Sequence, residues 1–249
     1  MTLLSKEKLV CIDCEATGLD PEKDQIIEVA VAQFDLEKTY DSFESLVDPQ
    51  CTIPEISIAI HHITEEMVKG KPTIDKVLPQ VIELIGKYTI IGHNISYDIA
   101  LIANAAKRYN IPCAIEKNVS IDTLRMARAY GQSPKNSLEK LREHFNIEPE
   151  GAHRAMNDVV VNIDVFRQLA KDYKTIGELL KVLSKPVKLK TMPLGQHKGR
   201  SFNEIPLNYL KWAANKDFDQ DLLYSIRAEL NKRKKGDSFG QVSNPFHGL

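Results

Sequence analysis

The chain has 249 residues, enough to bury one substantial hydrophobic core, or one core with a small satellite domain. Its composition is that of an ordinary globular protein, and no apolar run is long enough to span a membrane. The four cysteines are too few and too scattered for a disulfide framework, which excludes a disulfide-stapled secreted domain. Residues 1–6 have no signal-peptide pattern, so we expect a cytoplasmic protein.

The net charge of −1 conceals an asymmetry along the chain. From Lys174 onward there are 14 Lys and Arg residues against 7 Asp and Glu, so this part carries about +7 and the rest about −8. A basic appendage can hold a polyanion for an acidic domain that has no basic patch of its own. The final basic run, Lys232 to Lys235, is equally consistent with a solvated tail.

The first element in chain order is a buried strand that begins with the apolar run at residues 9–12. Because strand side chains alternate with a period of two, Asp13 and Glu15 lie on the same face. Thr17 and Gly18 close the strand with turn chemistry. An acid pair at a strand end is usually a solvated edge, so a metal site here requires partners elsewhere in the chain.

Two more strands are expected at residues 26–34 and 40–47, and the turn at 35–38 joins them into an antiparallel meander. Residues 54–64 read as a loop that leads into a helix with Thr64 as its N-cap. The apolar spacing over 72–84 predicts a further helix.

A strand at 88–91 precedes an apolar helix over 98–106, and another strand ends near residue 122. Asn136 is expected to cap the next helix, with Glu139 at capping-box spacing. Asp158 lies on a last apolar helix that runs to residue 169. Three strands followed by strands alternating with helices predict an α/β fold with a mixed β-sheet flanked by helices.

Cys11 and Cys14 form a C-x-x-C pair, a spacing that also occurs in redox and zinc sites. On a strand, positions three apart point to opposite faces, and no second cysteine pair completes a tetrahedral zinc site. We therefore expect both thiols to be reduced and structural.

Acidic residues recur in three segments, the last of which also contains a histidine: Asp13 with Glu15, Asp98, and His153 with Asp158. In this order and with these spacings the segments resemble the three motifs of the DnaQ-like (DEDDh) 3′-to-5′ exonucleases. That family includes the DNA polymerase III epsilon subunit, exonuclease X-like proteins, RNase T and oligoribonuclease. The resemblance extends from about residue 8 to residue 169, and it implies the RNase H-like architecture.

The resemblance implies that the four acids hold two Mg²⁺ or Mn²⁺ ions. Carboxylates suit these hard cations, which prefer oxygen ligands. Two such ions can stabilise both the attacking and the leaving oxygen of a phosphodiester. It also implies that His153 is the general base, since an imidazole titrates near ~6.5 and is partly free to accept a proton near neutrality.

By the same resemblance, further residues are expected to contact the substrate or to support the second motif: Thr17, Gly18, Leu19, His62, Asn94 and Tyr97. His61 and His62 lie next to each other in a turn, called here the histidine turn. Either one of them contacts the terminal nucleotide, or the histidine only fixes the loop. Tyr97 stands where Phe is common in the family.

We expect an exonuclease domain over residues 1–173, a linker over 174–190, a small basic module over 191–235 and a disordered tail over 236–249. The module resembles one that recurs beside DnaQ-like exonucleases. His197, Lys198 and Arg200 are candidates for phosphate contacts, with an aromatic residue stacking on a base. Alternatively, Tyr209 and Trp212 form the module's small core.

The function implied is a metal-dependent 3′-to-5′ exonuclease that acts on DNA and releases nucleoside 5′-monophosphates in proofreading, repair or processing. Its partners would be single-stranded or frayed 3′ ends, and a DNA polymerase is a further candidate partner. An RNA-trimming exoribonuclease is the alternative within the enzyme class, because the choice depends on how the site treats the 2′-hydroxyl. A non-catalytic subunit that binds a polymerase or nucleic acid is the alternative of another class.

Overall fold

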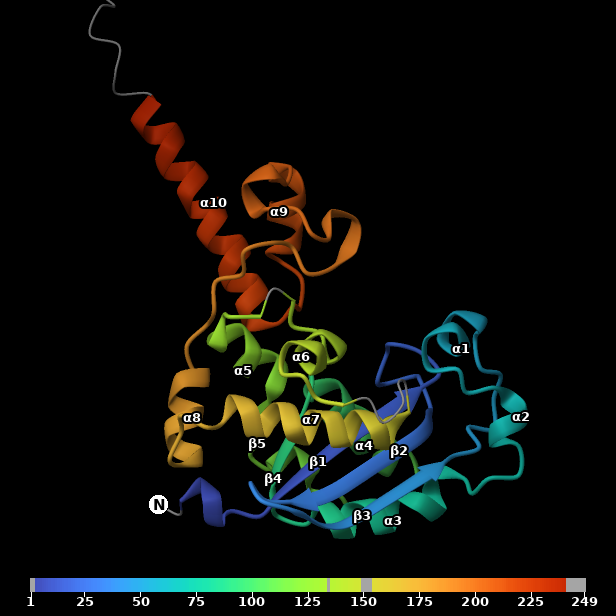
Figure 1. The fold of residues 1–249 in the computed structure, drawn as a ribbon. Helices are drawn as coiled ribbons and strands as arrows, with labels where there is room; N and C mark the ends of the chain where they lie inside the picture. The colour runs from blue at the N-terminus through green and yellow to red at the C-terminus, as the bar shows by residue number, and fades with distance from the viewer. Residues whose placement is uncertain (1–2, 134, 149–153, 241–249) are drawn as a thin grey trace, which may run out of the picture. The chain divides into compact units, whose positions relative to one another are not determined.

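The computed structural model describes residues 3–133, 135–148 and 154–240. By its internal contacts the chain divides into two compact units, residues 1–182 and 183–249. The strands of the first unit are β1 (Leu9–Ala16), β2 (Ile26–Phe34), β3 (Thr39–Leu46), β4 (Thr89–Gly92) and β5 (Ser120–Asp122). They form one sheet in the order β3-β2-β1-β4-β5 (Figure 1).

Strand β1 is the centre of this sheet. It pairs antiparallel with β2, which pairs antiparallel with β3 across the expected turn at residues 35–38. On its other side β1 pairs in parallel with β4, and β4 pairs in parallel with β5. The sheet is mixed and flanked by helices, which confirms the expected α/β, RNase H-like fold.

The α-helices are α1 (Glu55–His61), α2 (Glu65–Val68), α3 (Ile74–Ile85), α4 (Ser96–Arg108), α5 (Thr123–Tyr130), α6 (Leu138–His144), α7 (Ala155–Leu169), α8 (Ile176–Leu183), α9 (Leu207–Ala213) and α10 (Gln220–Gly240). Short 3-10 segments are η1 (Leu4–Lys6), η2 (Ile115–Lys117), η3 (Gly195–His197) and η4 (Phe202–Glu204). Among the described residues, no helix combines the length and apolar character that a membrane span requires.

The two faces of β1 bury different partners. Val10 and Ile12 belong to a hydrophobic cluster with residues of α3 and α4. The alternate residues face α7, which packs on β1 and β2 (Figure 1). The ring of Phe166 on α7 meets Phe34 of β2 edge to face, with centroids 5.9 Å apart, so the helix is fixed against the sheet.

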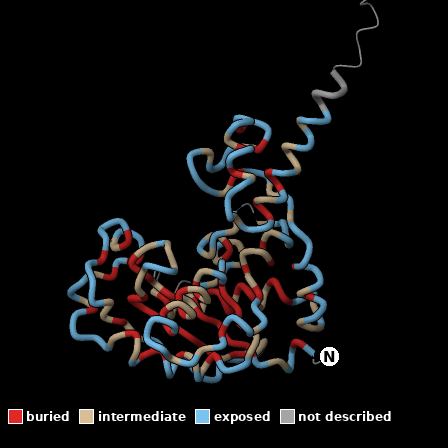
Figure 2. Tube along the Cα trace, turned by 180° about the vertical axis from the view of Figure 1, so that it is seen from behind, coloured by how far each residue is buried: buried red, intermediate tan, exposed pale blue. Residues whose placement is uncertain are grey.

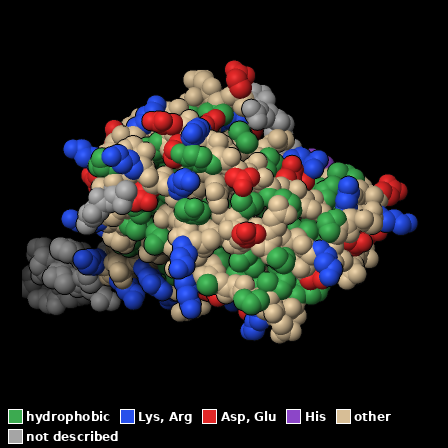
Figure 3. Space-filling model, turned by 90° about the horizontal axis from the view of Figure 1, so that it is seen from below, with side chains coloured by type: hydrophobic (Ala, Val, Ile, Leu, Met, Phe, Trp, Pro, Cys, Tyr) green, Lys and Arg blue, Asp and Glu red, His purple; other side chains and the backbone are tan. Residues whose placement is uncertain are grey.

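Burial follows this layering. Figure 2 shows the buried residues along the sheet and the helices against it, whereas the connecting loops are exposed. On the face seen in Figure 3, Lys and Arg side chains are interspersed with Asp and Glu, and hydrophobic side chains form small separate areas. That face therefore presents no extended field of one charge sign.

The second unit has its own small core around α9 and α10, made by Met192, Phe202, Ile205, Leu210, Ala213, Leu222 and Ile226. The chain before it is tied to α10, because the N–H of Val187 donates to Asp221 Oδ1 (2.9 Å) and that of Leu189 to Ser225 Oγ (2.8 Å). Asp221 and Ser225 are both buried.

The structure differs from the sequence expectation at four places. Residues 54–64, expected as a loop, contain helix α1. The segment 174–190, expected as a linker, contains α8, because its apolar residues recur at helical spacing before Pro186. Helix α10 continues through residues 236–240, which were expected to be disordered, while residues 241–249 lie outside the described part. Ser137, not Asn136, is the N-cap residue of α6.

Candidate active site

Three carboxylates from two elements meet beside the central strand. Asp13 and Glu15 lie on the face of β1 that α7 covers, and Asp158 lies in the first turn of α7. One carboxylate oxygen from each of the three residues lies within 4.8 Å of the other two. Oxygen donors at this separation are suited to a hard divalent cation, so the residues fit Mg²⁺ or Mn²⁺.

Asp98 reaches the same place from α4. The parallel pairing of β1 with β4 brings the start of α4 beside β1, and the backbone N–H of Cys14 donates to Asp98 Oδ1 (2.9 Å). Asp98 is only 5% exposed. The four acids line a cavity of about 350 Å³, together with Cys14, His93, Asn94, Tyr97, Ser137, Leu138 and Glu139.

The start of α7 is anchored by Glu28 of β2, which stands directly opposite Glu15 in the strand register. Glu28 is fully buried. Its Oε1 accepts from Arg154 Nε (2.9 Å) and Nη2 (2.6 Å), and its Oε2 accepts from the N–H of Ala155 (3.0 Å). A carboxylate at a helix N-terminus is favoured by the exposed N–H groups and the helix dipole.

A second anchor lies one turn beyond Asp158. Asn162 is 2% exposed, and its amide donates to Cys11 Sγ (3.6 Å) on β1. Its Oδ1 accepts from Thr123 Oγ1 (2.7 Å) at the start of α5. Residues four apart share a helix face, and residues two apart share a strand face. The Asn162–Cys11 contact therefore sets Asp158 over Asp13.

Both cysteines of the C-x-x-C pair are free and buried. Burial, followed by repulsion from nearby carboxylates, raises the pKa of each thiol well above its usual value. The thiols thus remain protonated at neutral pH, as a structural role requires.

Burial and mutual repulsion raise the pKa values of the cavity acids in the metal-free protein. Burial is the largest cause at Asp13, followed by repulsion from Asp98, Asp158, Glu15 and Glu28. At Glu15, burial and repulsion from Asp158 and Glu28 raise the pKa to about 7. Burial also raises the pKa of Asp98, although the N–H of Cys14 opposes the shift. A bound cation would reverse these shifts by compensating the charges.

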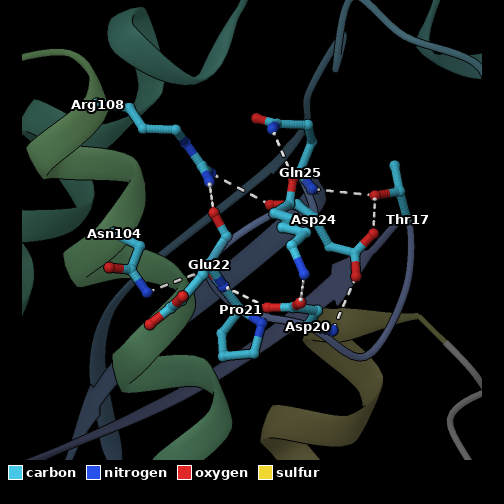
Figure 4. A network of polar contacts seen from close by, with 9 residues as sticks. Thr17, Asp20, Pro21, Glu22, Asp24, Gln25, Asn104 and Arg108 are labelled. Carbon is cyan, nitrogen blue, oxygen red and sulfur yellow. Dashed lines mark hydrogen bonds and ion pairs between the residues drawn. The ribbon is translucent and has the colours of Figure 1, made fainter.

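The loop after β1, residues 17–25, carries three of the expected substrate-contacting residues, Thr17, Gly18 and Leu19, and is tied to α4 (Figure 4). Asn104 Nδ2 donates to the carbonyl of Pro21 (3.1 Å), and Arg108 donates to the carbonyls of Glu22 (3.1 Å) and Asp24 (3.2 Å). The hydroxyl of Tyr97 donates to the carbonyl of Gly18. The helix that supplies Asp98 thus also holds this loop.

Within the loop, Asp24 explains the glycine at position 18. Thr17 Oγ1 donates to Asp24 Oδ1 (2.8 Å), and the N–H of Asp20 donates to Asp24 Oδ2 (2.8 Å). A Cβ at Gly18 would lie 2.6 Å from Asp24 Oδ2, closer than real contacts allow. A larger residue at position 18 would displace the Asp24 carboxylate and the two hydrogen bonds that it accepts. Leu19, next in the chain, is 88% exposed.

The histidine turn separates its two histidines. His61 is 2% exposed, and its Nδ1 accepts from the N–H of Ile63 (3.0 Å), so it fixes the loop. His62 is exposed and ends α1 in the left-handed conformation with φ 59°. Of the other expected residues, Asn94 and Tyr97 line the acidic cavity, whereas Thr17, the first residue of the loop, is buried.

His153 lies outside the described residues. His197, Lys198 and Arg200 belong to the second unit, where the last two are exposed and His197 is half-buried. Sequence reasoning missed Glu28, Arg154 and Asn162. Two of them carried a signal, because Glu28 is an acid inside an apolar strand and Asn162 is an amide on the apolar face of a helix.

His93 is a further residue of the cavity wall, and its Nδ1 lies 3.1 Å from Thr123 Oγ1. Burial lowers its pKa to about 4, so the imidazole is neutral near pH 7. Through Thr123 it is connected to Asn162 in a chain of polar contacts.

The fold and the carboxylate cluster together define a nuclease domain of the RNase H-like class. A family model described as "Exonuclease" (RNase T) matches residues 10–166, well over half of the chain. The chain belongs to this exonuclease family and is a 3′-to-5′ exonuclease of the DEDDh type. A second model, "Putative quorum-sensing-regulated virulence factor", matches residues 179–227.

Curated relatives include the DNA polymerase III subunit epsilon of Aquifex aeolicus, which is 34% identical over 164 residues. That alignment covers 66% of this chain and 80% of the relative. The PolC-type DNA polymerase III of Caldanaerobacter subterraneus is 32% identical over 68% of this chain, which spans only 12% of that protein.

Among solved structures, exonuclease X in complex with 5′-overhanging duplex DNA superposes with a TM-score of 0.57 and 26% identity, covering 70% of this chain and 99% of that one. Escherichia coli exonuclease I in complex with a dA16 oligonucleotide superposes with a TM-score of 0.61 and 21% identity, covering 72% of this chain and 42% of that one. At that identity the second likeness concerns the fold alone.

Proposed function

We propose that the chain hydrolyses DNA from its 3′ end and releases nucleoside 5′-monophosphates, with two divalent cations and His153 as the general base. The observation that carries this proposal is the convergence of Asp13, Glu15 and Asp158 within 4.8 Å in a cavity that Asp98 also lines. Four acids facing one cavity repel a polyanion unless cations intervene. A protein that only bound nucleic acid would have no use for them.

In this proposal the four acids hold the cations, Mg²⁺ or Mn²⁺. When bound, the cations supply positive charge that stabilises the attacking hydroxide and the leaving 3′-oxygen. The protein's contribution is to hold the acids in place: Glu28 and Asn162 fix α7, and the N–H of Cys14 fixes Asp98. Such supporting contacts keep the ligands oriented before substrate arrives.

His153 is assigned as the base on its sequence position, five residues before Asp158, because an imidazole near neutrality accepts a proton from water. Thr17, Gly18, Leu19, Asn94 and Tyr97 are assigned to the terminal nucleotide. The exposed side chain of Leu19 and the cavity positions of Asn94 and Tyr97 support this assignment. His62, as the exposed histidine of its turn, is the one proposed to contact substrate.

DNA is proposed over RNA because the relative from Aquifex aeolicus is a DNA polymerase subunit and exonuclease X was solved with duplex DNA. The same relatives make a DNA polymerase a partner to test, by co-elution of the purified proteins. We place the protein in the cytoplasm, where its nucleic acid would be. RNA trimming is the competing outcome of the experiment below.

The test is a time course on matched 5′-labelled single-stranded DNA and RNA, with Mg²⁺, with Mn²⁺ and with EDTA. Two variants on the same helix are compared. Asp158→Asn removes a proposed ligand, whereas Asp164→Asn changes an acid that is 41% exposed and pairs with Arg167. We expect the wild type and Asp164→Asn to produce a metal-dependent ladder of labelled products that shorten from the 3′ end. Asp158→Asn should produce none.

Faster cleavage of RNA would replace DNA by RNA as the substrate. Tight binding of either strand without any cleavage would favour the non-catalytic subunit. A His153→Ala variant that binds substrate but has lost most of its turnover is expected, and unchanged turnover would remove His153 from the mechanism.

A further inference from the structure

The second unit carries a row of aromatic rings at its surface. His197 of η3 meets Tyr209 of α9 edge to face, with centroids 4.5 Å apart, and Tyr209 meets Trp212 at 5.3 Å. The ammonium group of Lys216 lies 5.0 Å from the centre of the Trp212 ring. Half of the Trp212 surface is exposed.

Trp212 is not needed for the core of this unit. Leu210 and Ala213, its neighbours on α9, are fully buried in that core, and Tyr209 packs against it only in part. The expectation that Tyr209 and Trp212 together form the small core is thus wrong for Trp212. An indole left half in solvent beside a lysine, rather than buried, is a feature of ligand-stacking sites.

The turn that brings His197 into the row is held rigidly. Its glycines, Gly195 and Gly199, have φ values of 71° and 84°, which other residues rarely adopt. A Cβ at Gly195 would lie 2.9 Å from the Tyr209 hydroxyl, so the turn packs closely on that ring. Backbone hydrogen bonds between Met192 and both Gly199 (2.8 Å) and Arg200 (2.9 Å) close the turn. The row is therefore formed before any ligand binds.

Lysines adjoin the row in the chain, and most of the described acids of this unit take part in its own fold. Lys198 and Lys211 are exposed and form no ion pair with the described residues. Asp221 accepts from the N–H of Val187, Glu204 closes a capping box at η4, and Glu229 pairs with Arg233 at 2.8 Å. Asp219 accepts from the first N–H groups of α10, whereas Asp217, next to Lys216 in the chain, is exposed.

We propose that this row is a binding site for single-stranded nucleic acid, with one base stacked on Trp212 and the neighbouring phosphates on Lys198, Lys211 and Lys216. Aromatic stacking between lysines is how proteins hold single strands without reading their sequence. A polyanion is also the occupant that the positive charge of this unit complements. The role of the site, to hold the body of a strand during digestion, rests on the proposed exonuclease function, but the binding does not.

Trp212 is the single tryptophan of the chain, so its fluorescence reports on the site directly. The full-length Asp158→Asn protein, which should not degrade its ligand, is titrated with an oligodeoxythymidylate. The proposal expects saturable quenching of Trp212 emission that weakens as salt is added. Binding is followed in parallel by the anisotropy of a labelled oligonucleotide, which also serves the variants that lack Trp212.

Trp212→Ala should weaken oligonucleotide binding about tenfold, and Trp212→Phe should recover part of the loss because a ring is restored. Tyr224→Ala is the matched control, since Tyr224 lies on α10 and is 45% exposed without belonging to the row. Replacing Lys198 and Lys211 by alanine should reduce the slope of log Kd against log salt by about 0.7 for each lysine that contacts a phosphate. Unquenched emission, or equal affinities for Trp212→Ala and Tyr224→Ala, would overturn the site.

A short substrate separates this inference from the proposed function. In the otherwise wild-type protein, Trp212→Ala should leave hydrolysis of the p-nitrophenyl ester of thymidine 5′-monophosphate unchanged and raise KM for long single-stranded DNA. If the wild type cleaves neither substrate, the exonuclease proposal fails while the fluorescence titration still decides the site. If both substrates are cleaved as well by Trp212→Ala as by the wild type, the role of the site in digestion is excluded.

Discussion

The buried Glu28 of β2 and the partly exposed Arg154, the residue before α7, form an ion pair that joins two parts of the chain 126 residues apart. Both guanidinium bonds go to one carboxylate oxygen, at 2.9 and 2.6 Å, which leaves the other oxygen to accept the N–H of Ala155 at 3.0 Å. Because Asp158 lies in the same helical turn, the pair determines where that carboxylate stands relative to Glu15.

Glu28→Gln should therefore impair catalysis as well as stability. The fully buried side chain loses the charge that both Arg154 and the helix start require, while the half-exposed Arg154 remains partly solvated. We expect the free energy of unfolding to fall by about 1–3 kcal/mol and kcat to fall more than KM rises, since the metal ligands and not the substrate contacts are displaced. Chemical denaturation and steady-state kinetics on single-stranded DNA measure the two effects.

Glu44→Gln is the control for that variant. Glu44 also approaches Arg154, at 3.7 Å, but its side chain is 36% exposed. Its loss should change the free energy of unfolding by less than about 1 kcal/mol. Equal effects of the two substitutions would show that the Glu28–Arg154 pair has no special role.

Asn162→Ala should weaken metal binding without touching a ligand. The variant removes the amide that connects α7 to Cys11, so Asp158 is no longer held over Asp13. Loss of such a supporting contact usually costs about 10-fold to 100-fold in metal affinity or activity. Calorimetric titration with Mn²⁺ measures the affinity, with Asp164→Asn as the control on the same helix. A Kd for Mn²⁺ equal to that of the wild type would contradict this account.

The stability of the metal-free protein should fall as pH rises. The pKa of Glu15 is about 7 in the folded protein and 4.5 without its environment, so the folded state binds the proton more tightly than the unfolded state. The contribution of this group is therefore fully present below its unfolded pKa and is lost as pH rises toward the folded pKa. Asp13 and Asp98 shift in the same direction.

Thermal unfolding in EDTA at about pH 5 and about pH 8 tests this linkage. The Tm of the wild type should decrease more between these two pH values than the Tm of Glu15→Gln, because the glutamine has no proton to release. Mg²⁺ should raise the Tm more at the higher pH, where the carboxylates are charged. A Tm that rises with pH in EDTA would show that the acids are not crowded in solution as they are here.

Arg108→Ala should act on substrate binding rather than on chemistry. Arg108 donates to two carbonyls of the loop 17–25 and touches no acid of the cavity. Freed of these bonds, the loop exchanges its amide hydrogens faster and holds Leu19 less firmly, so KM for single-stranded DNA rises while kcat changes little. Hydrogen exchange of the loop and steady-state kinetics are the measurements. Lys107→Ala, one residue earlier on α4, should match the wild type in both.

Local pattern predicted much of the fold. The apolar run and the period of two placed Asp13 and Glu15 on one face of a buried strand, and three strands followed by alternating strands and helices indicated the mixed sheet. These are properties of short segments, which backbone geometry and side-chain alternation determine without knowledge of distant residues. The expected strand and helix over 88–106 correspond to β4 and α4 for the same reason.

What pattern alone misjudged lies at segment boundaries and at surfaces. The spacing in residues 176–183 is helical, but Pro186 favoured the interpretation as a linker. The N-cap residue of α6 is Ser137, one residue after the predicted Asn136. Trp212 shares a helix face with Tyr209, yet it remains half exposed, because Leu210 and Ala213 form the core from another face of α9.

The amino-acid sequence by itself determined which residues could perform the chemistry and on which elements they stand. Only the tertiary structure decided that Asp98 approaches β1 through the N–H of Cys14, and that Glu28 and Asn162 set α7 in register with the strand. These contacts join residues 84, 127 and 151 positions apart. No local periodicity encodes such pairs, because each depends on how whole elements pack, and packing selects one arrangement from many that satisfy the same pattern.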